Sequence, residues 1–377
     1  MQRLLLPLLA ALLLSPPPAQ AELRGAWISS VHNINFPSRQ GLSEQEQKNQ
    51  AIRLLDAAKS AGLNAVILQV RPESDALYPS QLEPWSRYLT GKQGVSPGYD
   101  PLAFFIAEGR KRGIEVHAWI NPYRAATNAS HSRTSNHISR RFPQYAYRIG
   151  NILWMDPGAP EVRRHINAVV RDLVTRYDIA GIHLDDYFYP YPTPKGGLPN
   201  FPDDTTHRAS GTNLSKPDWR RQNVNTLIRE LGQTVRSTRP GVQFGVSPFG
   251  TYTKGSPSDV KAGVDQYNQL FADPVTWMRQ GWVDYLAPQL YWKEGGPQSF
   301  SSLLRWWRSP AANPCGIPIV PGIAVDRLTS HGWGPDEISR QLRLEKNISP
   351  RPQGGFLLWN IGPVSKNTKG VLAAIRP

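Results

Sequence analysis

The chain has 377 residues, of which 43 are Lys or Arg, 29 are Asp or Glu and one is Cys. A hydrophobic content of 40% and an aromatic content of 10% are enough to build a large core, which excludes intrinsic disorder as the main state. The single Cys excludes an intrachain disulfide, a Cys-based zinc site and a Cys-Cys redox pair.

Residues 1–21 have the pattern of a secretory signal peptide. Arg3 precedes an apolar run over Leu4–Leu14, and the segment ends in the small-residue exit Ala19–Ala21. The alternative is an N-terminal membrane anchor, but the run is shorter than the roughly 20 residues that a spanning helix needs. We therefore expect export to a bacterial periplasm or the exterior, with no stable membrane insertion once the signal is removed.

The net charge of +14 would suit nucleic acid, but the basic residues are scattered along the chain. The sequence has no Lys-rich tail, RNA-binding segment or zinc finger, so we expect no nucleic-acid partner. For an exported basic protein we expect an anionic cell-wall polymer or a membrane surface instead. The alternative is a solvated surface with no specific anionic partner.

Eight apolar runs, rich in β-branched and aromatic residues and bounded by Gly or Pro, predict β-strands. They are Arg24–Val31, Asn64–Pro72, Glu115–Arg124, Gly181–Pro190, Gln243–Gly250, Val283–Trp292, Pro318–Asp326 and Gly354–Gly362. Helical patterns alternate with them. These cover Ser43–Ala61, Pro101–Arg112, Pro160–Tyr177, Asp218–Thr238, Pro274–Gln280, Ser299–Arg308 and Asp336–Lys346.

This alternation predicts an α/β fold, a (β/α)8 TIM barrel forming a single domain over residues 22–377. A doubly wound sheet is the alternative, but the first strand is not followed by the Gly-x-Gly-x-x-Gly turn of its usual phosphate site. Long loops are expected over Ala125–Asp156, Tyr191–Pro217 and Thr251–Asp273, and loops of this length are usually functional.

Polar and aromatic side chains gather toward the carboxyl ends of six of the eight strands. Chemistry in a barrel collects at that end, and alternate side chains point inward. The residues are Gln69, Arg71, Glu73, His117, Trp119, Asn121, Tyr123, His183, Asp185, Gln289, Tyr291, Asp326, Trp359 and Asn360. Buried polar groups cost free energy unless they are paired, so the pattern favours a site. The alternative is a polar rim that meets solvent.

Asp185 and Asp186 are adjacent at the end of the fourth strand. Strand alternation sends one of them inward, and parity with His183 favours Asp185. Glycoside hydrolysis typically uses two carboxyl groups that flank the scissile bond. Besides Asp186, the candidates for the second group are Glu73, Asp326 and Glu294, among which the sequence does not choose.

A metal site is the competing use of such carboxylates, with His183 as a further ligand. His-x-Asp on one strand is a weak pattern, however, and no second His cluster is present, so we predict neither a metal nor a cofactor. The aromatic residues favour a sugar ligand, because flat rings stack on pyranoses while amides and Arg bind hydroxyls. These rings are Trp27, Trp119, Tyr123, Trp154, Tyr187, Tyr189, Tyr291, Trp292 and Trp359.

Five segments resemble the family-10-like glycosyl hydrolases, bacterial exported proteins long described as a domain of unknown function. The segments are Arg24–Ser38, Gln69–Ser80, Trp119–Arg124, Gly181–Pro190 and Pro288–Trp292, and the likeness runs from Arg24 to the last strand. The resemblance implies a TIM barrel and glycosidase activity. For some members it implies action on peptidoglycan glycan strands without stem peptides.

Two wider analogies give Asp185 different roles. Gly-x-x-x-Asp at the end of the fourth strand resembles the nucleophile strand of α-glycosidase barrels. The same segment resembles the strand-four acids of chitinase-like barrels, in which the substrate's acetamide attacks and a Tyr, here Tyr291, orients it. The sequence departs from that second pattern, because Tyr187 stands where a Glu would follow Asp185.

We therefore predict an exported glycoside hydrolase acting on a cell-wall or related amino-sugar polysaccharide. Asp185 is the essential carboxylate. Sugar-positioning roles are predicted for Arg71, Asn121, Tyr123, His183, Tyr187, Gln289, Tyr291, Asp326, Trp359 and Asn360. The loop after the third strand adds His131, Arg133, His137, Arg140 and Arg141, which could face carboxylates of a wall glycan or simply be solvated. The rival functions are a non-catalytic polysaccharide-binding barrel and an anion-binding protein.

Overall fold

Eight parallel strands form the central sheet of the computed structural model, which describes residues 22–193, 197–261, 263–350 and 354–376. Their order around the sheet is β10–β11–β1–β2–β3–β7–β8–β9. The strands are β1 (Leu23–Ile28), β2 (Ala65–Arg71), β3 (Glu115–Ile120), β7 (Gly181–Leu184), β8 (Gln243–Val246), β9 (Tyr285–Leu286), β10 (Gly322–Ile323) and β11 (Gly355–Leu358). The predicted signal peptide lies outside the described residues.

Parallel bridges join the two ends of this sheet. Leu286 pairs with Ile319 and Gln289 pairs with Gly322, which links β9 to the segment containing β10 and completes the ring. The (β/α)8 barrel is thus confirmed, and all eight predicted strands are present. The strands are shorter than predicted, mostly at their carboxyl ends, where the chain leaves the ladder of backbone hydrogen bonds.

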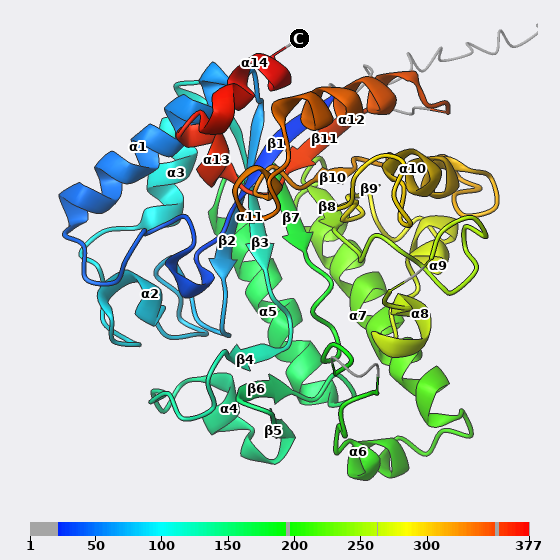
Figure 1. Cartoon of the computed structure of the whole chain (residues 1–377). Coiled ribbons are helices and arrows are strands. Elements are labelled where there is room, and N and C mark those ends of the chain that lie inside the picture. Colours follow the sequence, from blue (N-terminus) through cyan, green and yellow to red (C-terminus); the bar gives the residue numbers. More distant parts are fainter. Residues whose placement is uncertain (1–21, 194–196, 262, 351–353, 377) are drawn as a thin grey trace, which may run out of the picture.

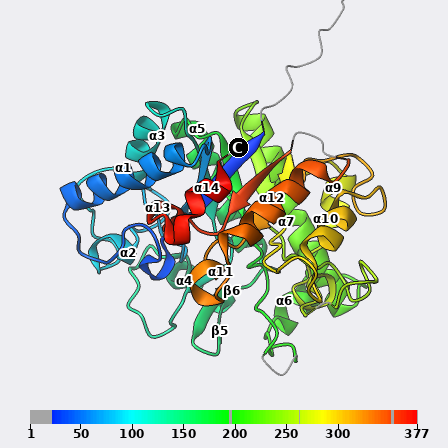
Figure 2. The same ribbon diagram turned by 45° about the horizontal axis from the view of Figure 1, so that its top comes forward.

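Helices cover the outside of the barrel (Figure 1; Figure 2). Those that match predicted helices are α1 (Glu44–Ser60), α3 (Pro101–Arg110), α5 (Pro160–Arg176), α7 (Lys216–Thr238), α9 (Pro274–Arg279), α10 (Phe300–Arg308) and α12 (Pro335–Asn347). Helices of four to six residues that the sequence patterns do not predict are α2 (Arg87–Thr90), α4 (Ile138–Arg141), α6 (Asp204–Ala209), α8 (Gln266–Gln269), α11 (Arg327–Ser330), α13 (Ile361–Ser365) and α14 (Val371–Ile375). None of the described helices combines the length and apolarity that crossing a membrane requires.

Local sequence explains where the first helix begins. Ser43 accepts a hydrogen bond from the backbone N–H of Glu46, and the Glu46 carboxylate accepts one from the Ser43 N–H at 2.8 Å. This capping box satisfies two backbone donors that a helix start would otherwise leave free. Ala51, Leu55 and Ala58 then form the buried face of α1 against the barrel.

Glycines make room for large side chains inside the barrel. A Cβ on Gly245 would lie 2.0 Å from the ring of Tyr285, and one on Gly181 would lie 2.3 Å from Nδ1 of His117. The interior is filled by rings and aliphatic groups, among them the buried Trp27 and Trp119, so it is a packed core rather than a channel.

A small antiparallel sheet projects beyond the barrel, in the order β4–β6–β5. It comprises β4 (Arg124–Ala126), β5 (Ala146–Ile149) and β6 (Ile152–Met155), and it lies with α4 below the barrel in Figure 1. The prediction of a loop over Ala125–Asp156 is wrong here. The strands have three or four residues each, too few to show a hydrophobic period.

Candidate active site

A cavity of about 300 Å³ lies at the carboxyl ends of the barrel strands. Its aromatic walls are Trp27, Trp119, Tyr187, Tyr191, Tyr291 and Trp359. Its polar groups are Gln69, Arg124, Asp185, Asp186, Ser247 and Gln289, and its rim is Val31, His32 and Ile34. Two acidic side chains thus share one aromatic-walled space with an Arg and two amides.

Both Asp185 and Asp186 line this cavity, although strand alternation predicts that only one of them points inward. The prediction is wrong because β7 ends at Leu184, and the chain beyond it is irregular. Alternation holds only within the pleated strand. Leaving the strand early therefore lets two consecutive carboxyls reach one space.

Asp185 is almost completely buried and is held by its neighbours. The side-chain amide of Asn121 donates a hydrogen bond to its Oδ2, and the backbone N–H of Tyr187 lies 3.4 Å from its Oδ1. Burial raises the pKa of Asp185 to about 7, an effect that the Arg124 guanidinium opposes and the Asp186 carboxyl adds to. The side chain can therefore hold a proton near neutral pH.

Asp186 has a different set of partners. The Tyr191 hydroxyl donates to its Oδ2, and the Gln289 side chain also hydrogen-bonds to its carboxylate. Burial raises the pKa of Asp186 to about 6, although these two hydrogen bonds act to lower it. Interacting carboxyls titrate as a pair, so between about pH 6 and 7 the two groups together hold about one proton.

Gln69 fixes the wall behind Asp185. Its Oε1 accepts hydrogen bonds from the backbone N–H groups of Ser30 and Val31, both at 2.9 Å. Its Nε2 donates to Oδ1 of Asn121 at 2.5 Å, and Arg124 donates to the same Oδ1 at 2.9 Å. With Oδ1 occupied in this way, the Asn121 amide group is oriented to donate to Asp185.

Two aromatic clusters form the walls. Tyr187 stacks on Trp154 with a ring separation of 6.1 Å, while the Arg124 guanidinium lies 4.9 Å from the centre of the Tyr187 ring. Trp359 stacks on Tyr291 at 6.3 Å. Burial and the carboxyls of Asp186, Asp326 and Asp185 raise the pKa of Tyr291, so its hydroxyl stays protonated and can donate.

His183 lies in the barrel interior, outside the cavity lining. Its Nε2 is 3.0 Å from Oγ of Ser247 and accepts from Nε1 of Trp27 at 3.3 Å, while its Nδ1 is 2.9 Å from the Tyr285 hydroxyl. Burial lowers the pKa of His183 well below its usual value, so the ring is neutral. The structure thus places it under the site as a support for Ser247, and not in reach of a ligand in the cavity.

Arg71 and Tyr123 are also outside the lining. Arg71 is completely buried and forms an ion pair with Glu83 at 2.5 Å, while its Nη1 donates to the backbone carbonyl of Asn121. Glu83 in turn lies 2.9 Å from Nε2 of His165. Tyr123 is fully buried in the core. Neither predicted sugar-binding side chain is brought to the cavity.

Glu73 and Glu294, the two glutamates predicted as further catalytic candidates, are held elsewhere. Glu73 accepts from the Tyr88 hydroxyl at 3.1 Å and lies 3.2 Å from Nε of Arg87. Burial acts to raise the pKa of Glu73, but hydrogen bonds from Thr127 and the Arg87 charge bring it below the usual value. Glu294 accepts from the backbone N–H and the hydroxyl of Ser301, both at 2.8 Å, at the start of α10.

The last two predicted residues stand at the starts of short helices. Asn360 accepts hydrogen bonds from the Asn35 amide at 2.8 Å and from the Gly362 N–H at 3.0 Å, which caps α13. Asp326 precedes α11 and is partly buried. Burial raises the pKa of Asp326 against the opposing charge of Arg327. Neither residue lines the cavity.

Several cavity residues were not predicted from the sequence: Val31, His32, Ile34, Arg124, Tyr191 and Ser247. Arg124 ends the segment Trp119–Arg124, and Ser247 follows directly on β8, so a position at strand ends is the signal that could have identified them. His32 has a left-handed backbone (φ 54°) in a turn after β1, which no periodicity predicts. Within the described part of the chain, no three His, Cys, Asp or Glu side chains are grouped to hold a metal ion.

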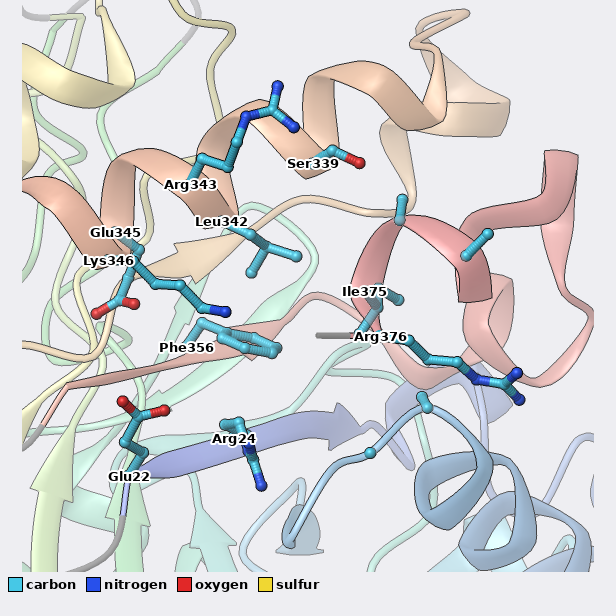
Figure 3. A pocket seen from close by; sticks show the side chains of 14 residues that line it. Glu22, Arg24, Ser339, Leu342, Arg343, Glu345, Lys346, Phe356, Ile375 and Arg376 are labelled. Carbon is cyan, nitrogen blue, oxygen red and sulfur yellow. The ribbon is translucent and has the colours of Figure 1, made fainter.

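A further cavity, of about 310 Å³, lies at the opposite end of the barrel (Figure 3). It is lined by residues at the amino ends of β1 and β11 and by α12 and α14, including Arg24, Phe356 and Lys346. Active sites of such barrels lie at the carboxyl ends of the strands, so the cavity with Asp185 and Asp186 is the candidate active site.

Comparison with known proteins agrees with this geometry. Residues 22–332 match the family model described as glycosyl hydrolase-like 10. Glycosyl hydrolase YngK of Bacillus subtilis is 40% identical over 363 residues, covering 93% of this chain and 70% of YngK. Glycosyl hydrolase DigH of Escherichia coli K12 is 36% identical over 379 residues, covering 91% of this chain and 85% of DigH.

A solved structure supports the fold independently. The glycoside hydrolase domain of PgaB from Bordetella bronchiseptica superposes with a TM-score of 0.56 at 12% identity, covering 94% of this chain and 99% of that domain. The family match, the two relatives and the paired carboxyls at the strand ends converge on one conclusion. The chain belongs to the glycosyl hydrolase-like 10 family and is a glycoside hydrolase.

Proposed function

We propose that this glycoside hydrolase is exported and cleaves an amino-sugar polysaccharide of the cell wall, with peptide-free peptidoglycan glycan strands as its substrate. The observation that carries the proposal is the placement of Asp185 and Asp186 together in a buried, aromatic-walled cavity. Stacking rings and hydrogen-bonding amides are the groups that orient a sugar. Export follows from the pattern of residues 1–21, and the net charge of +14 favours an anionic polymer.

The carboxyl pair supplies acid catalysis. Near pH 6–7 the pair holds about one proton, which a protonated carboxyl gives to the glycosidic oxygen as the C1–O bond breaks. We assign this proton to Asp185, whose pKa is the higher of the two. The ionised Asp186 then stabilises the positive charge that develops on the sugar.

The nucleophile in this proposal is the substrate's own acetamide oxygen. The two carboxyls are consecutive in the chain, and no other carboxyl among the described residues lines the cavity. The acetamide oxygen forms a bond to C1 as the leaving oxygen departs with the proton, and the carboxylate of Asp186 takes up the amide proton. Water then adds to C1 of the five-membered ring formed in this way, and the bond between C1 and the acetamide oxygen breaks. Asp185 takes a proton from the water, and Asp186 returns its proton to the amide nitrogen. The Tyr291 hydroxyl, kept protonated, donates to the acetamide.

The test uses the chain from residue 22 onward with intact and peptide-free wall glycans, measuring new reducing ends and mass-mapping the products. We expect turnover of the peptide-free glycan, and no turnover by Asp185→Asn, whose shape and Asn121 contact are kept. Glycan retention and thermal unfolding of the variant serve as controls for binding and folding. Full turnover by Asp185→Asn rejects the assignment. Glycan retention without new reducing ends at any pH, in the unaltered protein, would favour the non-catalytic alternative.

A further inference from the structure

A second cavity, of about 580 Å³, adjoins the catalytic one. Tyr187 and Tyr191 line both cavities, so the two spaces share a wall. The far side of the second cavity is formed by the β5–β6 hairpin, through Arg148, Ile149, Ile152 and Trp154. This hairpin belongs to the small sheet that projects beyond the barrel, below it in Figure 1.

The shared wall is rigid. Tyr187 is held between the Arg124 guanidinium, 4.9 Å from its centre, and the ring of Trp154, which stacks on it at an interplanar angle of 24°. Trp154 is fixed in turn, because its Nε1 donates to the backbone carbonyl of Phe188 at 2.9 Å. Tyr191 packs on Tyr187 at 5.4 Å and donates its hydroxyl to Asp186. The rings that border the second cavity therefore also contact the catalytic groups.

The chemistry of the second cavity suits a sugar chain with acidic substituents. Its surface is mainly aliphatic and aromatic, through Ile149, Ile152 and Trp154, which matches the apolar faces of pyranose rings. Arg148 lies at the edge and is exposed, with its Nε bonded to the Gly150 carbonyl at 3.0 Å. Its terminal nitrogens have no other hydrogen bond or ion pair among the described residues, so they can meet a carboxylate in solvent.

We propose that this second cavity binds the sugar units that follow the cleaved bond along the polymer, so that the enzyme acts within glycan chains and prefers long ones. This rests on the proposed function, because the occupant is the continuation of the substrate. Adjacency to the catalytic cavity identifies the occupant, because a chain that leaves Asp185 and Asp186 over the edge formed by Tyr187 and Tyr191 reaches this space next. Arg148 selects polymers that carry carboxylates.

The experiment compares kcat/KM over a length series of peptide-free peptidoglycan oligosaccharides, from the disaccharide upward. For the unaltered enzyme, kcat/KM rises with length. In Ile152→Ala the loss of kcat/KM grows with length and reaches about tenfold on polymer, the cost of removing apolar contacts from such a pocket. In Arg148→Ala the loss also grows with length but stays at about twofold to fivefold, because an ion pair made by an exposed Arg contributes little. Arg53→Ala on α1 and Ile317→Ala before β10 are matched controls, being an exposed Arg and a half-buried Ile outside both cavities.

A binding measurement separates this inference from the proposed function. Affinity for the glycans is measured in the Asp185→Asn background with and without Arg148→Ala. Turnover that is independent of length, or that falls equally at every length in the variants, would contradict glycan binding at the second cavity and leave the proposed function intact. The unaltered enzyme could instead show no turnover, while glycan binding rises with length and is weakened by Arg148→Ala. This result would contradict the proposed function and support glycan binding at the second cavity. Because Arg148 is exposed, we expect Arg148→Ala to fold normally, so a folding defect does not obscure the result.

Discussion

At the scale of single residues, the pH dependence of turnover follows from the two aspartates. Above about pH 7 Asp185 loses its proton and can no longer act as the general acid. Below about pH 6 Asp186 gains a proton and loses the negative charge that stabilises the sugar cation. We therefore expect a bell-shaped profile of kcat/KM with its maximum between these values. In Asp186→Asn the acidic limb should vanish from the residual activity. The alkaline limb should move to lower pH, because the Asp186 charge raises the pKa of Asp185. An unchanged pH profile of kcat/KM in Asp186→Asn would contradict the assignment of Asp185 and Asp186 as the titrating pair.

The same burial makes Asp185 a cost to stability at neutral and alkaline pH. Its folded-state pKa of about 7 lies above its unfolded value, so its contribution to stability is fully present in acid and is lost as the pH rises through about 7. The difference from an unfolded value near 3.9 corresponds to about 4 kcal/mol. We expect Asp185→Asn to be stabilising at pH 8, by that order, and close to neutral at pH 4. Denaturant unfolding at the two pH values measures this, and equal effects at both would contradict it.

The residues that sequence pattern misplaced have partners that pattern does not show. Arg71 is at an inward position of β2, as predicted, but its guanidinium is paired with the carboxylate of Glu83, which lies twelve residues further along the chain. Asn360 caps α13 and binds Asn35, a residue far away in the sequence. Asp185, Tyr187, Gln289, Tyr291 and Trp359 lie at the cavity as their strand-end positions predict.

At the scale of elements, Gln69 joins the ends of three strands. Its side chain on β2 binds the turn after β1 and the Asn121 side chain after β3. Gln69→Leu would leave the Ser30 and Val31 N–H groups buried and unpaired, at about 1–3 kcal/mol each. We expect a loss of about 2–6 kcal/mol in unfolding free energy, and a fall in kcat because Asn121 is no longer oriented toward Asp185. Gln69→Glu keeps the acceptor and should lose less stability. Equal, small losses in both variants would refute the role.

Strands and helices of the barrel could be predicted because each has a hydrophobic face long enough to show a period, as in α5 with its buried Val162, Ile166, Val170 and Leu173. The β4–β6–β5 sheet has no such signal. Its strands are stabilised by tertiary contacts, such as the stacking of Trp154 on Tyr187. These contacts depend on the fold of the chain that follows β7. The β5–β6 hairpin, which borders the second cavity, therefore could not be predicted from the sequence pattern.

At the scale of the whole molecule, the ring depends on its last strand. β11 pairs with β1 from Leu23↔Gly355 to Ala26↔Leu358 and also with β10, so it joins β1 to β10. A chain of residues 22–332 spans the family match yet lacks this strand. Without β11 the edges of β1 and β10 are unpaired and the interior around Trp27 is open to water.

We therefore expect the chain of residues 22–332 to show no cooperative thermal unfolding and no near-ultraviolet circular dichroism from ordered aromatic rings. A chain ending at Lys366 is the matched control, because it loses α14 but keeps β11 and α13. It should unfold cooperatively at a lowered temperature, since α14 packs on α12 and α13 rather than on the barrel strands. If the chain of residues 22–332 unfolded as cooperatively as this control, closure by β11 would not be what holds the barrel together. The site at its carboxyl ends would then have to be stabilised by the other seven strands.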